Sequence, residues 1–160
     1  MRKILVIHNK YRIRGGEDIA VENEVKLLKK FYEVKELYFS NTIEKPILQT
    51  FSFLFNKNTE SAKALEKEVE NFNPDIAYVH NTWFKASPEV FNILDKKNIK
   101  TIIKLHNFRY DCTRHFLIKK HLKGKEECSA CGISKKGRFL FNKYFIDSYL
   151  KSFFVLIYGK

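Results

Sequence analysis

The amino-acid sequence predicts an α/β fold, a Rossmann-like parallel sheet flanked by helices, and three observations lead to this prediction. Apolar runs typical of buried strands alternate with stretches in which apolar residues recur at helical spacing. This alternation is the pattern of βαβ units, whose crossovers place helices against a parallel sheet. The 160 residues suit a single domain, and a hydrophobic fraction of 44% is too high for a disordered chain.

The first half of the sheet is predicted from two strands joined by one helix. Residues 3–8 form a continuous apolar run, as expected for a strand that is covered on both faces. A helix follows the Gly15–Gly16 pair, with Asp18 as its predicted N-cap and apolar residues at helical spacing up to Phe31. Residues 33–39 alternate between polar and apolar side chains, which predicts the second strand.

Two further helices are predicted from their start signals. One covers 59–72 with Thr59 as its cap, and the other begins with Ser87 as N-cap and Pro88 at the first helical position. A less regular stretch around Pro46 leads into a short predicted helix within 47–55.

The remaining strands are predicted over 76–80 and 100–106, each bounded by turn residues or a helix. Because the segments 3–8, 75–80 and 100–105 each contain a run of apolar residues, we expect all three to lie in the interior of the sheet.

Polar stretches follow three of the predicted strands, at the point where each strand ends. They read HNKYRIRGGED after the first strand, HNTW after the third and HNFRYDC after the fourth. Ligands of open parallel sheets bind at the carboxyl ends of the strands. We therefore expect Gly16, His80 and His106 to line one cleft.

The Gly15–Gly16 pair has two interpretations, in a chain with only six glycines. It forms a simple tight turn, or its backbone N–H groups approach a phosphate at the helix N-terminus. The carboxylates of Glu17 and Asp18 oppose a phosphate unless they cap the helix or bind sugar hydroxyls, and Arg12 and Arg14 offset them. For His106 the two alternatives are a ligand-binding imidazole and a satisfied histidine at the edge of the core.

The stretch RGGED opening the first helix, HNTW followed by SPEVF, and LHNFRYDC followed by CSAC together resemble a known family. They are similar to the N-terminal domain of retaining GT-B glycosyltransferases, in the large group of bacterial polysaccharide and lipid-sugar transferases. The resemblance covers nearly the whole chain in the right order. It implies an enzyme that transfers a sugar from a nucleotide-sugar to a saccharide or lipid-linked acceptor.

The same resemblance implies a domain organisation. Residues 1–134 would form the Rossmann-like acceptor-side domain, including a cysteine-containing insertion at 108–134, and 135–160 a basic, aromatic helix that leads toward a second, donor-binding domain. The 160-residue chain would then be half of an enzyme, with little activity alone.

Site residues also follow from the resemblance. It implies a catalytic role for His106, and it implies that the glycine loop contacts the donor diphosphate or the acceptor. The substrate-binding residues implied at the strand ends are Arg14, Gly15, Gly16, Glu17, His80, Asn81, Asn107 and Arg109. The chemistry of this family requires no cofactor.

Three cysteines raise the question of a metal site. Cys112, Cys128 and Cys131 have the spacing C-x15-C-x2-C, and His115 or His121 could complete a tetrahedral structural zinc site. The alternative is three reduced, unligated thiols, because the relatives usually have a further downstream cysteine that this chain lacks.

Charge is concentrated late in the chain, since residues 101–160 carry 13 basic and 4 acidic groups. This excess favours an anionic partner, although a lysine-rich composition without function would give part of it. The alternative function is therefore a non-catalytic binding module for an anionic membrane surface or nucleic acid. Interleaved basic and aromatic residues, which a nucleic-acid-binding surface requires, are confined to the C-terminal segment, so no nucleic acid is expected as a partner. The N-terminal apolar run is too short for a signal peptide, which predicts a cytoplasmic protein, peripheral at the inner face of the membrane if its acceptor is lipid-linked.

Overall fold

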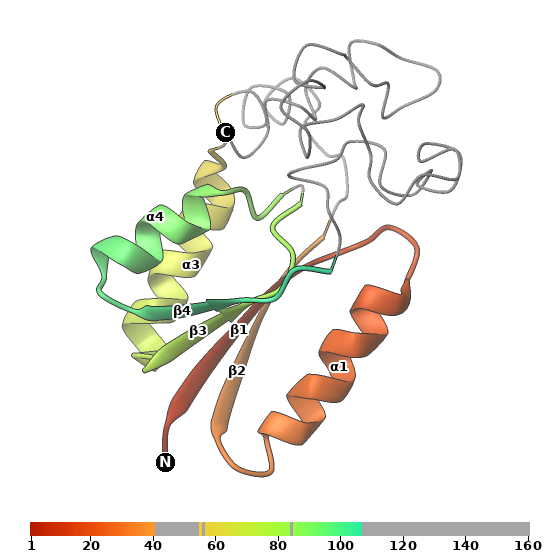
Figure 1. The fold of residues 1–160 in the computed structure, drawn as a ribbon. Coiled ribbons are helices and arrows are strands. Elements are labelled where there is room, and N and C mark those ends of the chain that lie inside the picture. The colour runs from red at the N-terminus through yellow and green to blue at the C-terminus, as the bar shows by residue number, and fades with distance from the viewer. Residues whose placement is uncertain (41–54, 56, 84, 107–160) are drawn as a thin grey trace, which may run out of the picture. The chain divides into compact units, whose positions relative to one another are not determined.

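The computed structural model describes residues 1–40, 55, 57–83 and 85–106 of the chain (Figure 1). Residues 1–106 form one compact unit. The helix expected within 47–55 lies almost wholly outside the described residues, and so do the predicted insertion 108–134, the helix 135–160 and the boundary between them.

In the described part of the chain, four parallel strands form one sheet in the order β2–β1–β3–β4 (Figure 1). Their bounds are β1 Lys3–Lys10, β2 Glu33–Ser40, β3 Ile76–Val79 and β4 Lys100–Ile103. In the register of β1, Ile7 lies opposite Leu37 of β2 on one side and Val79 of β3 on the other. The predicted α/β class with a parallel sheet is confirmed, and the arrangement is consistent with a Rossmann-like fold.

Among the described residues, three helices cover the sheet, one on one face and two on the other (Figure 1). They are α1 Gly16–Leu28, α3 Thr59–Phe72 and α4 Glu89–Lys96. Each buries an apolar pair four residues apart, Val21 and Val25 in α1, Leu65 and Val69 in α3, and Val90 and Leu94 in α4. Within the described part of the chain, no helix has the length and apolar character that crossing a membrane requires.

The central strand β1 is buried on both faces, as its continuous apolar run predicts. Leu5 and Ile7 pack on the face covered by α3 and α4, whereas Ile4 and Val6 pack against α1. Because side chains alternate along a strand, the next residue on the α1 face is His8, which is fully buried. A polar side chain thus continues the apolar row under the first turn of α1.

The position of β4 differs from the prediction. All four of its residues are exposed, and β4 is the edge strand of the described sheet. The expectation that 100–105 lies in the interior was therefore wrong. An apolar run shows that a strand forms, but Ile102 and Ile103 remain about half exposed, at 53% and 52%, because no described strand lies beyond them.

The predicted start of each helix is displaced by one to three residues. Gly15 rather than Asp18 is the N-cap of α1, and Asp18 lies in its first turn. Asn58 rather than Thr59 caps α3, with its Oδ1 accepting from the amides of Glu60 and Ser61. Pro88 rather than Ser87 is the cap of α4.

Candidate functional site

The candidate site lies at the carboxyl ends of β1 and β3, where the chain leaves two neighbouring strands toward opposite faces of the sheet. After β1 the chain continues into α1 on one face, and after β3 into α4 on the other (Figure 1). Such a topological switch point is where open parallel sheets bind ligands. Here it lies beside the residues that follow Ile7 and Val79.

Two buried asparagines join the chain segments at the switch point. The Asn9 amide donates to the Asn81 carbonyl at 2.8 Å, and Asn81 Nδ2 donates to the Asn9 carbonyl at 3.2 Å. Asn9 Oδ1 accepts from the Ala86 amide at 2.9 Å, and Asn81 Oδ1 accepts from the Trp83 amide at 2.9 Å. Both side chains thus hold the connection after β3 against β1.

Replacing Asn9 by Ala is expected to lower the free energy of unfolding by about 2 kcal/mol, because the buried Ala86 amide loses its acceptor. Urea titration of both proteins measures the difference. Asn92→Ala is the control: exposed Asn92 donates to Glu89 within α4, so its replacement should cost less than about 0.5 kcal/mol. Equal losses in the two variants would contradict the structural role of Asn9.

Asp18 is the acceptor around which the connection after β1 is built. Its side chain is buried; Oδ1 lies 2.9 Å from His8 Nε2 and 3.4 Å from the Tyr11 amide, and Oδ2 accepts from the Gly15 amide at 2.8 Å. Burial raises the pKa of this carboxyl, but the hydrogen bonds from Gly15, His8 and Tyr11 outweigh it and leave the pKa below its ordinary value. The carboxylate is therefore ionised at neutral pH.

His8 is a neutral imidazole at neutral pH. Burial lowers its pKa more than the hydrogen bond and charge of Asp18 raise it. Since Nε2 faces the Asp18 carboxylate, Nε2 carries the proton; Nδ1 is buried and has no hydrogen-bond partner among the described residues. The ring fixes Asp18 and, through it, the Gly15 amide.

The Gly15–Gly16 pair owes its glycines neither to positive φ nor to crowding. Gly15 has φ −119° and ψ −177°, an extended conformation that any residue adopts. A Cβ on Gly16 would meet nothing within 4 Å among the described residues, and a Cβ on Gly15 would lie 3.9 Å from Asp18 Oδ2. The space beside Gly16 is therefore open at the N-terminus of α1.

Two charged residues of the glycine loop, Arg14 and Glu17, have partners within the described unit. Arg14 forms an ion pair with Glu22, and Glu17 accepts a hydrogen bond from the Tyr11 hydroxyl at 2.9 Å. The Gly15 amide already donates a hydrogen bond to Asp18 Oδ2. An anion at this loop would therefore find the Gly15 amide already hydrogen-bonded to Asp18 and the charge of Arg14 already paired with that of Glu22.

His80 and His106, which follow β3 and β4, lie side by side. His80 Nδ1 is 3.0 Å from His106 Nε2, and the rings stack with centroids 5.3 Å apart. The His80 ring also contacts Tyr78, at 4.2 Å between centroids, and meets His8 edge-on at 6.1 Å. His8 in β1, His80 after β3 and His106 after β4 thus form one cluster.

A carboxylate from α1 completes this cluster. Glu24 accepts a hydrogen bond from the Tyr78 hydroxyl at 2.7 Å and forms an ion pair with Lys104, and its Oε2 lies 3.9 Å from His80 Nε2. Burial raises the pKa of Glu24, but the hydrogen bonds from Lys104 and Tyr78 outweigh it, so the pKa is lowered. Burial lowers the pKa of His80 to about 4.

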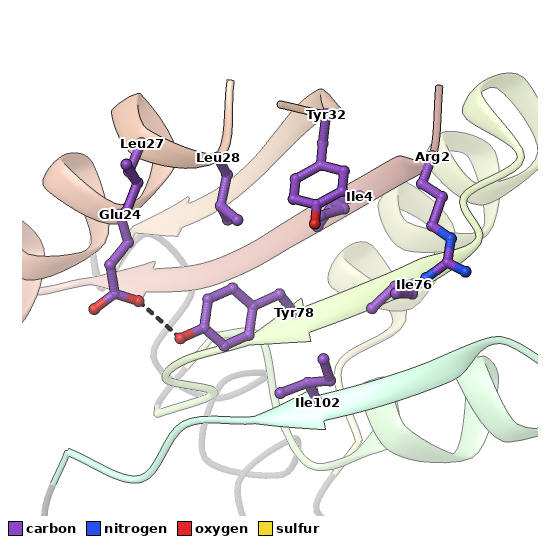
Figure 2. A pocket seen from close by; sticks show the side chains of 9 residues that line it. All are labelled: Arg2, Ile4, Glu24, Leu27, Leu28, Tyr32, Ile76, Tyr78 and Ile102. Atoms are coloured by element: carbon purple, nitrogen blue, oxygen red, sulfur yellow. Dashed lines mark hydrogen bonds between the residues drawn. The ribbon is translucent and has the colours of Figure 1, made fainter. Parts of the chain in front are cut away.

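An apolar groove of about 460 Å³ runs along the α1 face of the sheet (Figure 2). Figure 2 shows the hydrogen bond between Glu24 and Tyr78 at one end of this groove. Its other lining residues are Arg2, Ile4, Leu27, Leu28, Tyr32, Ile76 and Ile102. Because most of them lie toward the amino ends of the strands, the groove is separate from the switch point and borders the histidine cluster only through Glu24 and Tyr78.

The residues predicted from the sequence occupy three connections. Arg14, Gly15, Gly16 and Glu17 lie between β1 and the first turn of α1, His80 and Asn81 directly follow β3, and His106 follows β4. The structure brings His80 and His106 together and gives Asn81 a backbone-binding role. Outside the described residues lie Asn107, Arg109, Cys112, Cys128 and Cys131, together with the two histidines considered as zinc ligands.

Sequence reasoning missed His8, Asn9 and Glu24 as members of the site. The first two had a signal, because the dipeptide His-Asn recurs at the ends of three predicted strands, at 8–9, 80–81 and 106–107. Glu24 had none, since no periodicity relates a residue of α1 to His80, 56 positions later.

Between residues 1 and 106, as far as the structure describes them, no three His, Cys, Asp or Glu side chains are grouped so that they could hold a metal ion. Comparisons with protein-family models, with curated proteins and with solved structures found no match to this chain.

Proposed function

We propose that this chain is the acceptor-side half of a glycosyltransferase, which transfers a sugar from a nucleotide-sugar to a saccharide or lipid-linked acceptor. The observation that carries the proposal is the meeting of the polar strand ends at the switch point, where His80 lies 3.0 Å from His106 and Asp18 links His8 to the glycine loop. The resemblance of these same stretches to GT-B glycosyltransferases supplies the reaction.

Two features are suited to contact with the acceptor. His106 is only partly buried, and an imidazole nitrogen can accept a hydrogen bond from a sugar hydroxyl. The space beside Gly16 lets a ligand approach the backbone at the helix N-terminus. His80 and Asn81 are buried and bonded within the protein, so they position these contacts rather than make them.

The donor diphosphate needs cations, and two cations of the described site are already paired with carboxylates. Arg14 is paired with Glu22 and Lys104 with Glu24. The proposal therefore assigns the stabilisation of the leaving diphosphate to a donor-binding domain. Sugar transfer would take place in the cleft between that domain and the acceptor-side domain.

Gly16→Ala separates ligand binding from folding. We expect the free energy of unfolding to stay constant or to rise by about 0.5–1 kcal/mol, because the position has room for a methyl group and no positive φ. Affinity for saccharide and polyisoprenyl-linked saccharide acceptors should fall about tenfold, or about 1.4 kcal/mol, since the methyl group fills the approach to the backbone. NMR titration of the chain with a panel of such acceptors measures it.

Thr59→Ala is the matched control, since Thr59 is the first residue of α3 as Gly16 is of α1. Its acceptor affinity should equal that of the original chain. Equal affinity in Gly16→Ala would reject the loop as a binding element, and binding of anionic vesicles or oligonucleotides without any saccharide binding would favour the binding-module alternative.

The chain alone should release almost no nucleotide from a panel of sugar nucleotides, with or without these acceptors, because the proposal places the stabilisation of the leaving diphosphate in a separate donor-binding domain. Fusion to a donor-binding domain should restore turnover, and His106→Ala in that fusion should lower the turnover roughly a hundredfold relative to the fused original chain. Acceptor-dependent turnover by the chain alone would overturn the division of the site between two domains.

A further inference from the structure

Three polar side chains form a row from α1 to the residue that follows β4. Glu24 Oε2 lies 3.9 Å from His80 Nε2, and His80 Nδ1 lies 3.0 Å from His106 Nε2. The His80 side chain is completely buried in the middle of this row, whereas His106 is only partly buried. His80 therefore connects a carboxylate on α1 to the histidine that is open to a ligand.

The position of the proton on His80 follows from its neighbours. At neutral pH the ring is neutral, because burial lowers its pKa to about 4, and it carries a single N–H. His80 Nε2 has no hydrogen-bond partner among the described residues, and the ionised Glu24 carboxylate, with Oε2 3.9 Å away, attracts a hydrogen on Nε2 and repels a lone pair there. The proton therefore resides on Nε2, and Nδ1 is the acceptor.

The state of His106 follows in turn. Since His80 Nδ1 accepts, the hydrogen bond of 3.0 Å requires that His106 Nε2 carry a hydrogen and donate it. In the uncharged form of the ring, the lone pair of His106 then lies on Nδ1. We propose that Glu24 is a positioning residue that, through His80, fixes the tautomer of His106 so that Nδ1 is held as a hydrogen-bond acceptor.

The other groups around His80 hold this arrangement in place. Tyr78 donates its hydroxyl to the same Glu24 oxygen (Figure 2), and Lys104 pairs with the other carboxylate oxygen. On the remaining side His8 meets His80 edge-on, and its own Nε2 is bonded to Asp18. Burial above all, and the charge of Lys104 in addition, disfavour a positive charge on His80 against the attraction of Glu24, so the neutral ring persists.

This assignment deepens the proposed function, and it rests on that function only for the use of the lone pair. At the acceptor side of a glycosyltransferase, His106 Nδ1 would accept the hydrogen of the sugar hydroxyl that attacks the donor. The tautomer itself is a property of the free chain, and it can be tested without any substrate.

The test is ¹⁵N NMR of the full 160-residue chain with labelled histidine at neutral pH. We expect Nε2 of both His80 and His106 to be protonated and Nδ1 of both to be unprotonated. We also expect a scalar coupling between His80 Nδ1 and His106 Nε2 across the hydrogen bond. A protonated Nδ1 on His80, or a protonated Nδ1 with an unprotonated Nε2 on neutral His106, would overturn the assignment.

Glu24→Gln tests the part played by the carboxylate. Without the negative charge, the ratio of the Nε2–H to the Nδ1–H tautomer of His80 should fall about tenfold, as expected for the loss of one charge-assisted contact. The coupling to His106 should weaken as well. Glu22→Gln is the matched control on the same helix, because Glu22 pairs with Arg14 away from the histidines. Tyr78→Phe keeps the carboxylate and should keep the tautomer.

These outcomes separate the positioning role from the proposed function. An unchanged tautomer ratio in a folded Glu24→Gln protein would reject Glu24 as the positioning residue, even if acceptor binding is found. A confirmed tautomer together with an absence of saccharide binding would reject the glycosyltransferase proposal and leave the assignment of His106 standing.

Discussion

Acidification from about pH 7.5 to about pH 5 is expected to lower the free energy of unfolding by about 2 kcal/mol through His80 alone. Its side chain is completely buried, and burial lowers its pKa from 6.5 to about 4. Each unit by which the folded and unfolded pKa values differ corresponds to about 1.4 kcal/mol. His8, also buried with a lowered pKa, acts in the same direction.

The sign of the effect follows from proton binding. Below pH 6.5 an unfolded chain protonates the histidine, whereas the folded chain keeps it neutral until the pH approaches 4. The unfolded state therefore binds more protons in this window, and acid favours unfolding. Asp18 and Glu24, whose pKa values are lowered from 3.8 and 4.5, add their own loss of stability only at lower pH.

Urea unfolding at several pH values between these limits measures the slope. His80→Gln should be less stable at neutral pH but should lose about 2 kcal/mol less on acidification, because the titrating group is gone. Val21→Ala is the control: it removes buried volume beneath α1, so it should lower stability equally at every pH. Identical pH slopes in His80→Gln and in the original chain would contradict the buried, neutral state of His80.

Much of the fold could be predicted because it depends on short-range patterns. The run at 3–8 required two covered faces, and β1 has them; the pairs four residues apart in the three helices were visible as helical spacing. The caps were less predictable because a cap depends on which backbone amide turns toward which side chain. Asp18 was chosen as the cap from its residue type, but its oxygens bind the Gly15 amide and His8 from the first turn.

The candidate site was predictable only in part, for a similar reason. His80 and His106 were marked by their positions at strand ends, which the parallel topology brings together. Their partner Glu24 comes from another element and is fixed by the way α1 packs across β1 and toward Tyr78. Such a contact between distant segments has no local signature in one sequence.

Replacing Asp18 by Ala should lower the free energy of unfolding by about 3 kcal/mol, the second large effect expected in this chain. Asp18 is 3% exposed and its carboxylate accepts from the Gly15 amide and His8, so its removal leaves buried donors without their charged acceptor. Asp18→Asn keeps one oxygen in place, and we expect it to lose about half as much. Urea unfolding near neutral pH compares the three proteins.

The same variant should change the titration of His8. The hydrogen bond and the charge of Asp18 both raise the pKa of His8 against the effect of burial, so their removal should lower that pKa further. Glu17→Ala is the control in the same turn: Glu17 accepts from the Tyr11 hydroxyl, it is only partly buried, and its loss should cost less than about 1 kcal/mol. If Asp18→Ala were as stable as Glu17→Ala and left the His8 titration unchanged, Asp18 would not organise the glycine loop, and the link from β1 to the N-terminus of α1 would have to be sought in other residues.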